Sequence, residues 1–457
     1  MSALYDLYAR LPLPLQDAAV SLKGLDFRLR RESPRARRRM YRFLLASQWW
    51  SAEDFAAYQA RRLRNVLAHA VERSPYYRDR PVYRRALESG SEGEELLRRL
   101  PILDRQEVRR CQTELADPRV SRFLCTRIFT SGTTGTPLEL LETRRSFSER
   151  FAFVSRLRQW AGLSHPHLPR RAQLTGRDLV PDPTTRPDGV YWRRNLPGRA
   201  LLLSTTHIDA RTAPGYLRAL RAFAPELIDG YPSGLLALAR LGLSLGLEMP
   251  RPRAIITTAE TLAEADRTCL EEAFGCRVHD QYAASEPSCF WGECEHGTLH
   301  VSPEYGMSEI LDEAERPVSP GEEGTVVVTS FLSTVTPLLR YRLGDLAVPG
   351  GDPCPCGRAM PAVARVVGRE DDVLLIPGRG WVGRLDPVFK GVEGLIEAQI
   401  VAAAHEERFT REKQDSSFPR HASGRWSLVR HLLEDAPAPS DTERAIPSMC
   451  CSAPRAT

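Results

Sequence analysis

The sequence predicts an α/β protein in which a large, parallel-rich sheet is covered by helices. From about residue 225 the chain repeats a strand, a turn and a helix, in "PELIDGYPSGLLALARLGLSLGL", in "PRAIITTAETLAEADRTCLEEAFG" and in the strand of "CRVHDQYAASE". Consecutive units of this kind form parallel sheets, with ligands at the carboxyl ends of the strands. "EEGTVVVTSF" adds a buried strand, and 457 residues suffice for a large domain and a smaller one.

The first 120 residues are predicted to be helical and rich in arginine. In "SAEDFAAYQARRLRNVLAHAVERSPYY", Ser51 can cap a helix with Asp54 at its third position, and Pro75 marks its end. The apolar positions that share a face are Phe55, Leu63, Val66, Leu67, Ala70 and Val71. The preceding "RLRRESPRARRRMYRF" could contact anionic lipid or nucleic acid, but the simpler interpretation, which we favour, is a solvated surface.

One later helix carries its own start and stop signals. Thr261 and Glu264 have the spacing of a capping box, and Gly275 suits the end of the same helix.

The bulk composition is that of an ordinary globular enzyme. A net charge of +5 is small for this length, so it gives no reason to infer a nucleic-acid partner. No apolar run approaches the ~20 residues that span a bilayer, and the start lacks a basic region followed by an apolar one. We therefore expect a cytoplasmic protein without a transmembrane segment. Its ten cysteines are better explained as free thiols or metal ligands than as disulfides.

The stretch "FTSGTTGTPLEL" at residues 129–140 is the strongest functional signal. Gly132 and Gly135 can adopt positive φ angles, which lets backbone N–H groups approach a ligand, and the neighbouring hydroxyls add donors. Such a loop can hold nucleotide phosphates without a lysine. The alternative is a Gly/Thr hairpin turn with no ligand.

Two more stretches carry carboxylates beside aromatic residues. "QYAASE" at 281–286 ends a predicted strand, and "RYRLGD" at 340–345 places Asp345 just past a turn. Asp345 can accept hydrogen bonds from both ribose hydroxyls, and Glu286 can hold the Mg²⁺ that bridges phosphates. Taken singly, each residue is better explained without a ligand, the tyrosine as part of the core and the aspartate as a local cap.

Together and in this order, the motifs resemble those of the adenylate-forming superfamily of acyl-CoA synthetases. The matching stretches are 130–137, 282–286, 341–345 and "GREDD" at 368–372. Finer detail is similar to the phenylacetate–CoA ligase family and its CapK-type capsular polysaccharide biosynthesis branch: "LPLPLQ", "LRNVLAHAVERSPYYRD", "DGYPSGLLALA", "CPCGR" and "GRLDPVFKGVEGLIEAQIV". The resemblance covers about residues 1–401 and implies an adenylate-forming (ANL-like) fold.

The resemblance also implies a role for each matching residue. The pyrophosphate end of ATP would be bound by Thr130, Ser131, Gly132, Thr133, Thr134 and Gly135. The adenine pocket would be lined by Ala259 and Glu260, and Tyr282 would flank the adenine or the acyl group. The ribose would be held by Asp345 with Arg369. Glu286 would ligate Mg²⁺, and Asp371 would be a hinge. Of these, Thr130, Glu286 and Arg369 are the expected catalytic residues. Ala283 stands where the family usually has glycine.

The implied reaction has two steps. A small-molecule carboxylic acid attacks the α-phosphate of ATP to form an acyl-adenylate, and a thiol, normally that of CoA, then displaces AMP. Mg²⁺ and fixed donors would balance the charge that develops on the phosphoryl oxygens. The acceptor could also be a carrier-protein thiol or an amine.

Soft metal ligands gather at two places in the sequence. "CFWGECEHGTLH" at 289–300 and "CPCGR" at 354–358 could together supply Cys294, His300, Cys354 and Cys356 to a closed, structural Zn²⁺ site. His296 and Cys289 are reserve candidates. The alternative is a set of reduced thiols beside an unrelated histidine; similar Cys/His positions in the resembling family favour zinc.

The resemblance ends after Val401. We expect a helical region at 1–120, a nucleotide- and acyl-binding core at 121–368, a hinge and the start of a small, incomplete C-terminal domain at 369–401, and an atypical, poorly ordered tail at 402–457. The family's Ser-Gly-Lys segment has no match there, and Lys413 lies in a charged run without a glycine turn. The sequence therefore leaves a second hypothesis open, a catalytically impaired ATP-binding or scaffold protein associated with polysaccharide biosynthesis.

Overall fold

The computed structural model describes residues 3–130, 138–163, 168–175, 179, 189–369, 373–376 and 380–383. The chain divides into two compact units. One consists of Met1–Gly132 and Pro137–Val366, and the other of Thr133–Thr136 and Val367–Thr457. The fold elements described here belong to the first unit as far as Val366, and the strand residues from Val367 onward belong to the second.

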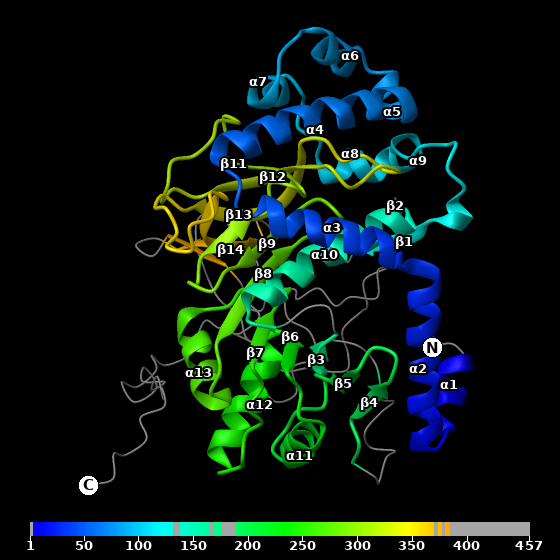
Figure 1. Cartoon of the computed structure of the whole chain (residues 1–457), viewed down its shortest axis with the longest axis vertical. Coiled ribbons are helices and arrows are strands. Elements are labelled where there is room, and N and C mark those ends of the chain that lie inside the picture. The colour runs from blue at the N-terminus through cyan, green and yellow to red at the C-terminus, as the bar shows by residue number, and fades with distance from the viewer. Residues whose placement is uncertain are drawn as a thin grey trace, which may run out of the picture. The chain divides into compact units, whose positions relative to one another are not determined.

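The N-terminal region is helical, as the sequence predicts (Figure 1). Its elements are α1 (Ala3–Arg10), α2 (Leu13–Arg31), α3 (Pro34–Ser47), α4 (Ala52–Arg73), α5 (Pro75–Arg78), α6 (Pro81–Glu88), α7 (Gly93–Arg98), α8 (Arg105–Arg110), α9 (Gln112–Leu115) and the 3₁₀ turn Arg122–Leu124. The predicted start of α4 is confirmed, because Ser51 Oγ accepts from the Asp54 backbone N–H at 3.1 Å and Asp54 accepts from the Ser51 N–H. Its buried face consists of the six predicted apolar residues.

A parallel sheet follows, with helices between its strands. The strands are β3 (Arg171–Thr175), β5 (Ala200–Ser204), β6 (Leu227–Gly230), β7 (Ala254–Thr257) and β8 (Val278–Ala283), with β4 (Trp192–Asn195) antiparallel at the edge. The helices are α10 (Arg144–Trp160), α11 (Ala213–Phe223), α12 (Pro232–Ser244) and α13 (Glu264–Phe274). The predicted strand–helix repeat from residue 225 is therefore confirmed.

The predicted capping box of α13 is wrong. The helix begins at Glu264 with Ala263 at its N-cap, and no side chain caps it. The chain is still turning before that point, since Ala259 has a left-handed φ of 64° and the Glu260 side chain bonds to Ser233. Thr261 therefore lies in the loop. Gly275 does end the helix, with φ 65°.

The strand β8 joins the parallel sheet to an antiparallel one. Its first half pairs in parallel with β7, and its second half pairs antiparallel with β9. The antiparallel strands are β9 (Phe290–Glu293), β10 (Leu299–Val301), β11 (Gly306–Leu311), β12 (Gly324–Ser330), β13 (Tyr341–Pro349) and β14 (Ala362–Arg369). The complete order is β11-β12-β13-β14-β10-β9-β8-β7-β6-β3-β5-β4, a mixed sheet. The buried strand predicted in "EEGTVVVTSF" is β12.

Two hairpins complete the described strands. In the first unit, β1 (Thr126–Thr130) pairs antiparallel with β2 (Leu138–Glu142). In the second unit, β15 (Val373–Ile376) pairs with β16 (Gly380–Gly383).

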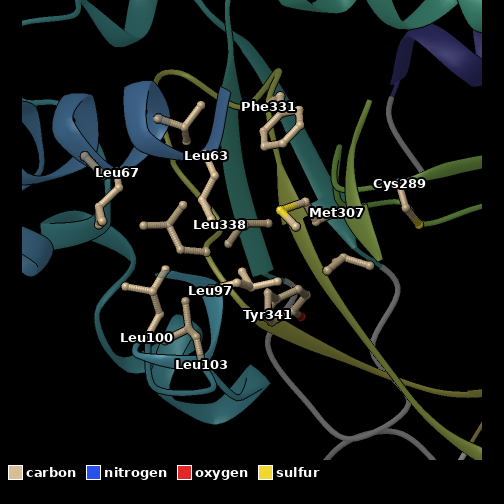
Figure 2. Close-up of a cluster of buried hydrophobic side chains, with 14 of the residues drawn as sticks. Leu63, Leu67, Leu97, Leu100, Leu103, Cys289, Met307, Phe331, Leu338 and Tyr341 are labelled. Atoms are coloured by element: carbon tan, nitrogen blue, oxygen red, sulfur yellow. The ribbon is translucent and has the colours of Figure 1, made fainter. Parts of the chain in front are cut away.

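The largest apolar core packs the N-terminal helices against the antiparallel strands (Figure 2). Leu63 and Leu67 of α4 contribute to it together with Met307 of β11 and Tyr341 of β13. Leu103 adds backbone hydrogen bonds, because its N–H donates to Arg340 and its carbonyl accepts from Arg342. This packing fixes the start of β13, which carries one of the predicted site motifs.

Candidate functional site at the end of strand β8

Two hydrogen bonds join the "QYAASE" and "RYRLGD" stretches. The Tyr282 hydroxyl donates to Asp345 Oδ2 at 2.6 Å, and the Tyr341 hydroxyl donates to Glu286 Oε1 at 3.3 Å. Each bond pairs a phenol of one stretch with a carboxylate of the other. The structure thus brings together three predicted site residues, Tyr282, Glu286 and Asp345, although the two stretches lie about sixty residues apart in the sequence.

A bulge in β13 explains the position of Asp345. Val327 pairs with Arg342 but Thr325 pairs with Leu346, so three residues of β13 face one of β12. Gly344 lies in this bulge with φ 77°, a conformation that favours glycine. Bulges bend a strand and change where side chains point. The backbone conformation at this bulge therefore explains why a glycine precedes the aspartate in the motif.

Tyr282 is held by its neighbour on β9. It pairs with Trp291 in the ladder, and the two ring centroids are 4.3 Å apart. The rings are tilted by 36° to each other, and close aromatic pairs of this kind restrict the orientation of both rings. The Tyr282 hydroxyl is thereby directed toward Asp345.

The turn that carries Glu286 is fixed by serine hydroxyls that the sequence did not single out. Ser330 Oγ donates to the Pro287 carbonyl at 2.6 Å, and Ser333 Oγ donates to the same oxygen at 3.1 Å. Glu286 itself is only 6% exposed. A signal was available, because Ser330 ends the predicted strand β12 and Ser333 follows it, but spacing alone did not show which turn they would hold.

Arg340 is a second residue whose role the sequence did not reveal. Its guanidinium forms a two-pronged ion pair with Glu309, with Nε–Oε2 and Nη2–Oε1 distances of 3.1 and 3.0 Å, and it donates to the Leu100 carbonyl. The first arginine of "RYRLGD" therefore anchors the motif to β11 and to the helical region.

Ala259 and Glu260 lie in the loop after β7, the neighbour of β8. The Glu260 carboxylate accepts from the backbone N–H and the hydroxyl of Ser233, both at 2.8 Å. Ser233 is in the first turn of α12, where N–H groups lack partners within the helix and a negative charge is favoured. Glu260 thus ties this loop to α12, and the strained Ala259 precedes it.

Of the predicted phosphate loop, the structure describes only Thr130 and the stem, which is the hairpin of β1 and β2 on either side of the loop. Thr130 ends β1 and pairs with Leu138 of β2. The stem is anchored by the Leu141 N–H, which donates to Thr336 Oγ1 at 3.2 Å. The remaining predicted residues, Ser131, Gly132, Thr133, Thr134 and Gly135, lie outside the described residues.

The residues predicted near the hinge fall in the second unit. Arg369 ends β14, and that unit begins at Val367. Asp371, Lys413 and the region 402–457 lie outside the described residues.

Four predicted zinc ligands converge. The Cys294, Cys354 and Cys356 sulfurs and a His300 ring nitrogen all lie within 4.8 Å of one another. Cys294 Sγ is 3.6 Å from Cys354 Sγ, and Cys356 Sγ is 3.4 Å from His300 Nε2. Zn–S bonds of about 2.3 Å at tetrahedral angles place two sulfurs about 3.8 Å apart, so these separations suit the ion.

The groups around the cluster also suit a metal ion. His300 Nδ1 lies 3.1 Å from the Met360 carbonyl, a bond that requires a proton on Nδ1 and leaves the Nε2 lone pair toward Cys356. Backbone N–H groups of His296 and Cys356 point at the Cys294 and Cys354 sulfurs. The buried Arg358 guanidinium, paired with Glu295, places a positive charge beside the three cysteine sulfurs, which would bind a metal ion as thiolates.

The reserve ligands are not members of this cluster. Cys289 belongs to the apolar core (Figure 2), where burial raises the pKa of its thiol to about 12. His296 contributes its backbone N–H to Cys294 and is absent from the four-ligand group found among the described residues.

The chain has relatives among known proteins. No family model matches the chain. Protein CapK of Staphylococcus aureus is 28% identical over 310 residues, which cover 67% of this chain and 66% of CapK. The phenylacetate-coenzyme A ligase of Thermus thermophilus is 27% identical, over 71% of this chain and 73% of its own length. That of Escherichia coli is also 27% identical, over 72% of this chain and 74% of its own length. The chain is a distant homologue of CapK and the phenylacetate-coenzyme A ligases.

Solved structures show which fold this phenylacetate-coenzyme A ligase homologue has. 2-Hydroxyisobutyryl-CoA ligase, in an open conformation with 2-HIB-AMP and CoA, matches with a TM-score of 0.55 at 20% identity. The match covers 72% of this chain and 78% of that one. The fold is therefore that of the adenylate-forming ligases, as the resemblance implies, and its large sheet is mixed. The alignment with CapK covers slightly less than two thirds of CapK.

Proposed function

We propose that this protein is an ATP-dependent carboxylate–CoA ligase that forms an acyl-adenylate and then transfers the acyl group to a thiol, normally CoA. The observation that carries the proposal is the pairing of Tyr282 with Asp345 and of Tyr341 with Glu286 at the end of β8. Homology to the phenylacetate-coenzyme A ligases and to CapK supports it. The sequence resemblance to the CapK-type branch favours a role in capsular polysaccharide biosynthesis. The need for ATP and CoA favours a cytoplasmic site of action.

Each side chain has a proposed task. Asp345 accepts hydrogen bonds from the ribose hydroxyls, and Tyr282 keeps the carboxylate in place and lies beside the adenine or the acyl group. Glu286 offers a carboxylate oxygen, the ligand type that Mg²⁺ prefers, on a turn that Ser330 and Ser333 hold rigid. Bound Mg²⁺ would supply charge neutralisation at the phosphates. Thr130 and the loop after it bind the pyrophosphate end of ATP, and Ala259 and Glu260 line the adenine pocket. Arg369 helps to hold the ribose, and Asp371 is the hinge.

Carboxylate-dependent exchange of labelled pyrophosphate into ATP, over a panel of aryl and fatty acids, tests the proposal. Glu286→Gln keeps the shape of the side chain but removes its charge, so we expect exchange to fall by a factor of about 10² to 10³. Glu313→Gln, at an exposed turn, serves as the control and should leave exchange unchanged. Equal exchange in the two variants would contradict the assignment of Glu286.

The second candidate is a catalytically impaired ATP-binding or scaffold protein. It is favoured by the three lysines of the sequence, Lys23, Lys390 and Lys413, none of which follows a Ser-Gly pair. The same assay separates the two functions. ATP binding without exchange, whichever acid is supplied, would favour the scaffold.

We also propose that Cys294, His300, Cys354 and Cys356 bind a structural Zn²⁺. The support is their mutual distance, the protonated Nδ1 of His300 and the nearby charge of Arg358. Four protein ligands leave no open position for a substrate, which is typical of structural zinc. The ion would connect the turn after β9 to the loop after β13.

A further inference from the structure

Helix α2 exposes a stripe of leucines. Leu15, Leu22, Leu25 and Leu29 are 53%, 66%, 42% and 65% exposed. At 100° per residue these four positions lie within about 80° of the helix circumference, so they form one continuous face. Isolated exposed leucines are common, but a stripe of them on one helix is typical of an interaction surface.

The opposite face of α2 is fastened to the protein. The buried Gln16 accepts from Arg193 Nε at 2.7 Å, Asp17 accepts from the Arg194 backbone N–H at 2.9 Å, and Arg28 donates to the Pro197 carbonyl at 2.6 Å. These bonds hold α2 beside β4, its neighbour in Figure 1. The leucine stripe therefore points away from the sheet on a helix that is fixed in place.

Helix α3 follows directly and exposes a stripe of arginines. Arg35, Arg38, Arg39 and Arg42 are all exposed and recur at helical spacing, whereas Tyr41 and Leu44 are buried on the other side. Within the described part of the chain, none of these four arginines forms an ion pair. The helices α1 to α3, residues 3–47, contain ten Arg or Lys and four Asp or Glu, a net charge of +6, which exceeds the +5 of the whole chain.

We propose that α2 and α3 bind the surface of an anionic lipid bilayer. The leucine stripe would enter the boundary between headgroups and acyl chains, as amphipathic interfacial helices do, and the arginines would bind lipid phosphates. None of the described helices is long and apolar enough to span a membrane, so the binding is peripheral. A second copy of the chain is a poorer occupant, because pairing of α2 with itself would bring two segments of charge +6 together.

This inference departs from the sequence prediction of a purely solvated surface at this segment. The arginines alone supported that prediction, since charged runs usually face water. What the structure adds is the exposed leucine face of α2, the helix that precedes them in the chain.

Co-sedimentation of the full chain with vesicles tests the proposal. Vesicles of phosphatidylcholine with about 30 mol% phosphatidylglycerol should bind the protein at low salt, and pure phosphatidylcholine vesicles should not. Changing Arg38 and Arg39 to Gln should weaken binding about fivefold per arginine, and changing Leu22 and Leu29 to Ser should weaken it about tenfold. Both variants keep the buried faces intact.

Each double variant has a matched control elsewhere on the surface. Arg84→Gln with Arg85→Gln removes two exposed arginines of α6, and Leu243→Ser with Leu245→Ser removes two leucines that are 44% and 46% exposed. The controls should bind vesicles like the wild type. Three results would overturn the proposal: equal binding to both vesicle types, an α2 or α3 variant that behaves like its control, or a dimer in light scattering that Leu22→Ser with Leu29→Ser dissociates while vesicle binding is absent.

Discussion

Two sets of contacts join the same two stretches of chain, residues 281–300 and 341–358, and they differ in chemistry. One set consists of the hydrogen bonds from Tyr282 to Asp345 and from Tyr341 to Glu286. The other is the group of Cys294, His300, Cys354 and Cys356. A hydrogen bond contributes on the order of 1 kcal/mol net and can be exchanged for a ligand, whereas a structural zinc site contributes several times more. On the proposed function, the zinc site would be a fixed cross-link, and the two hydrogen bonds would form a cross-link that a bound nucleotide rearranges.

Breaking the fixed cross-link should have the largest effect. With Cys354 and Cys356 both changed to Ser, we expect loss of the bound zinc and a fall in the free energy of unfolding of about 3 kcal/mol or more, because two ligands and the ion are lost together. Elemental analysis and thermal unfolding measure the two quantities. Cys125→Ser, outside the cluster, should change neither. Purified wild type with less than about half an equivalent of zinc would contradict the site.

A buried carboxyl group next to the polar cross-link should make stability depend on pH. Burial raises the pKa of Asp280 to about 7. The hydrogen bond that Thr257 donates to its carboxylate at 2.6 Å lowers the pKa, but by less than burial raises it. Since the folded pKa exceeds the unfolded value of about 3.9, the folded state binds the proton more tightly. Stability from this group is therefore present at low pH and is lost as the pH rises from about 4 to about 7.

The isosteric variant Asp280→Asn isolates that effect. The free energy of unfolding of this variant should lack the decline that Asp280 causes in the wild type, which is about 3 kcal/mol between pH 4 and pH 7. Thermal unfolding across this range measures the slope. The same decline in both proteins would show that Asp280 does not cause it.

Removing one phenol at a time should have the smallest effects. Tyr282→Phe should lower the free energy of unfolding by about 1 kcal/mol, and Tyr341→Phe by less, because the first hydroxyl lies 2.6 Å from its carboxylate and the second 3.3 Å. Chemical denaturation of both variants gives the comparison. A larger loss for Tyr341→Phe would mean that the shorter bond is not the stronger one.

The sequence was informative wherever the determinants are local. The capping of α4 by Ser51, its buried face and the repeat around β6 to β8 follow from neighbouring residues, and each is present. The four Cys and His positions could also be named, because few residue types bind zinc. The capping box at Thr261 failed because a contact from Glu260 to Ser233, 27 residues away, sets where α13 begins.

Other features depend on register and on distant neighbours. The bulge that places Asp345, the serines that hold the Pro287 carbonyl and the ion pair between Arg340 and Glu309 join segments that no short window of sequence contains. The leucine face of α2 is likewise defined by which side of the helix meets β4. A periodic apolar pattern is usually assigned to the core, so only the structure separates a buried stripe from an exposed one.

The most direct test of the central claim is binding of an acyl-sulfamoyl-adenosine, a hydrolysis-resistant mimic of an acyl-adenylate. It does not require catalysis, so it tests the site at the end of β8 alone. At about 100 times its dissociation constant, the mimic should stabilise the wild type by about 2.7 kcal/mol and raise its melting temperature. Asp345→Asn should lose most of this increase, whereas Asp312→Asn, at the turn after β11, should retain it. An increase of the same size in Asp345→Asn, or none in the wild type with any acyl group, would contradict the account.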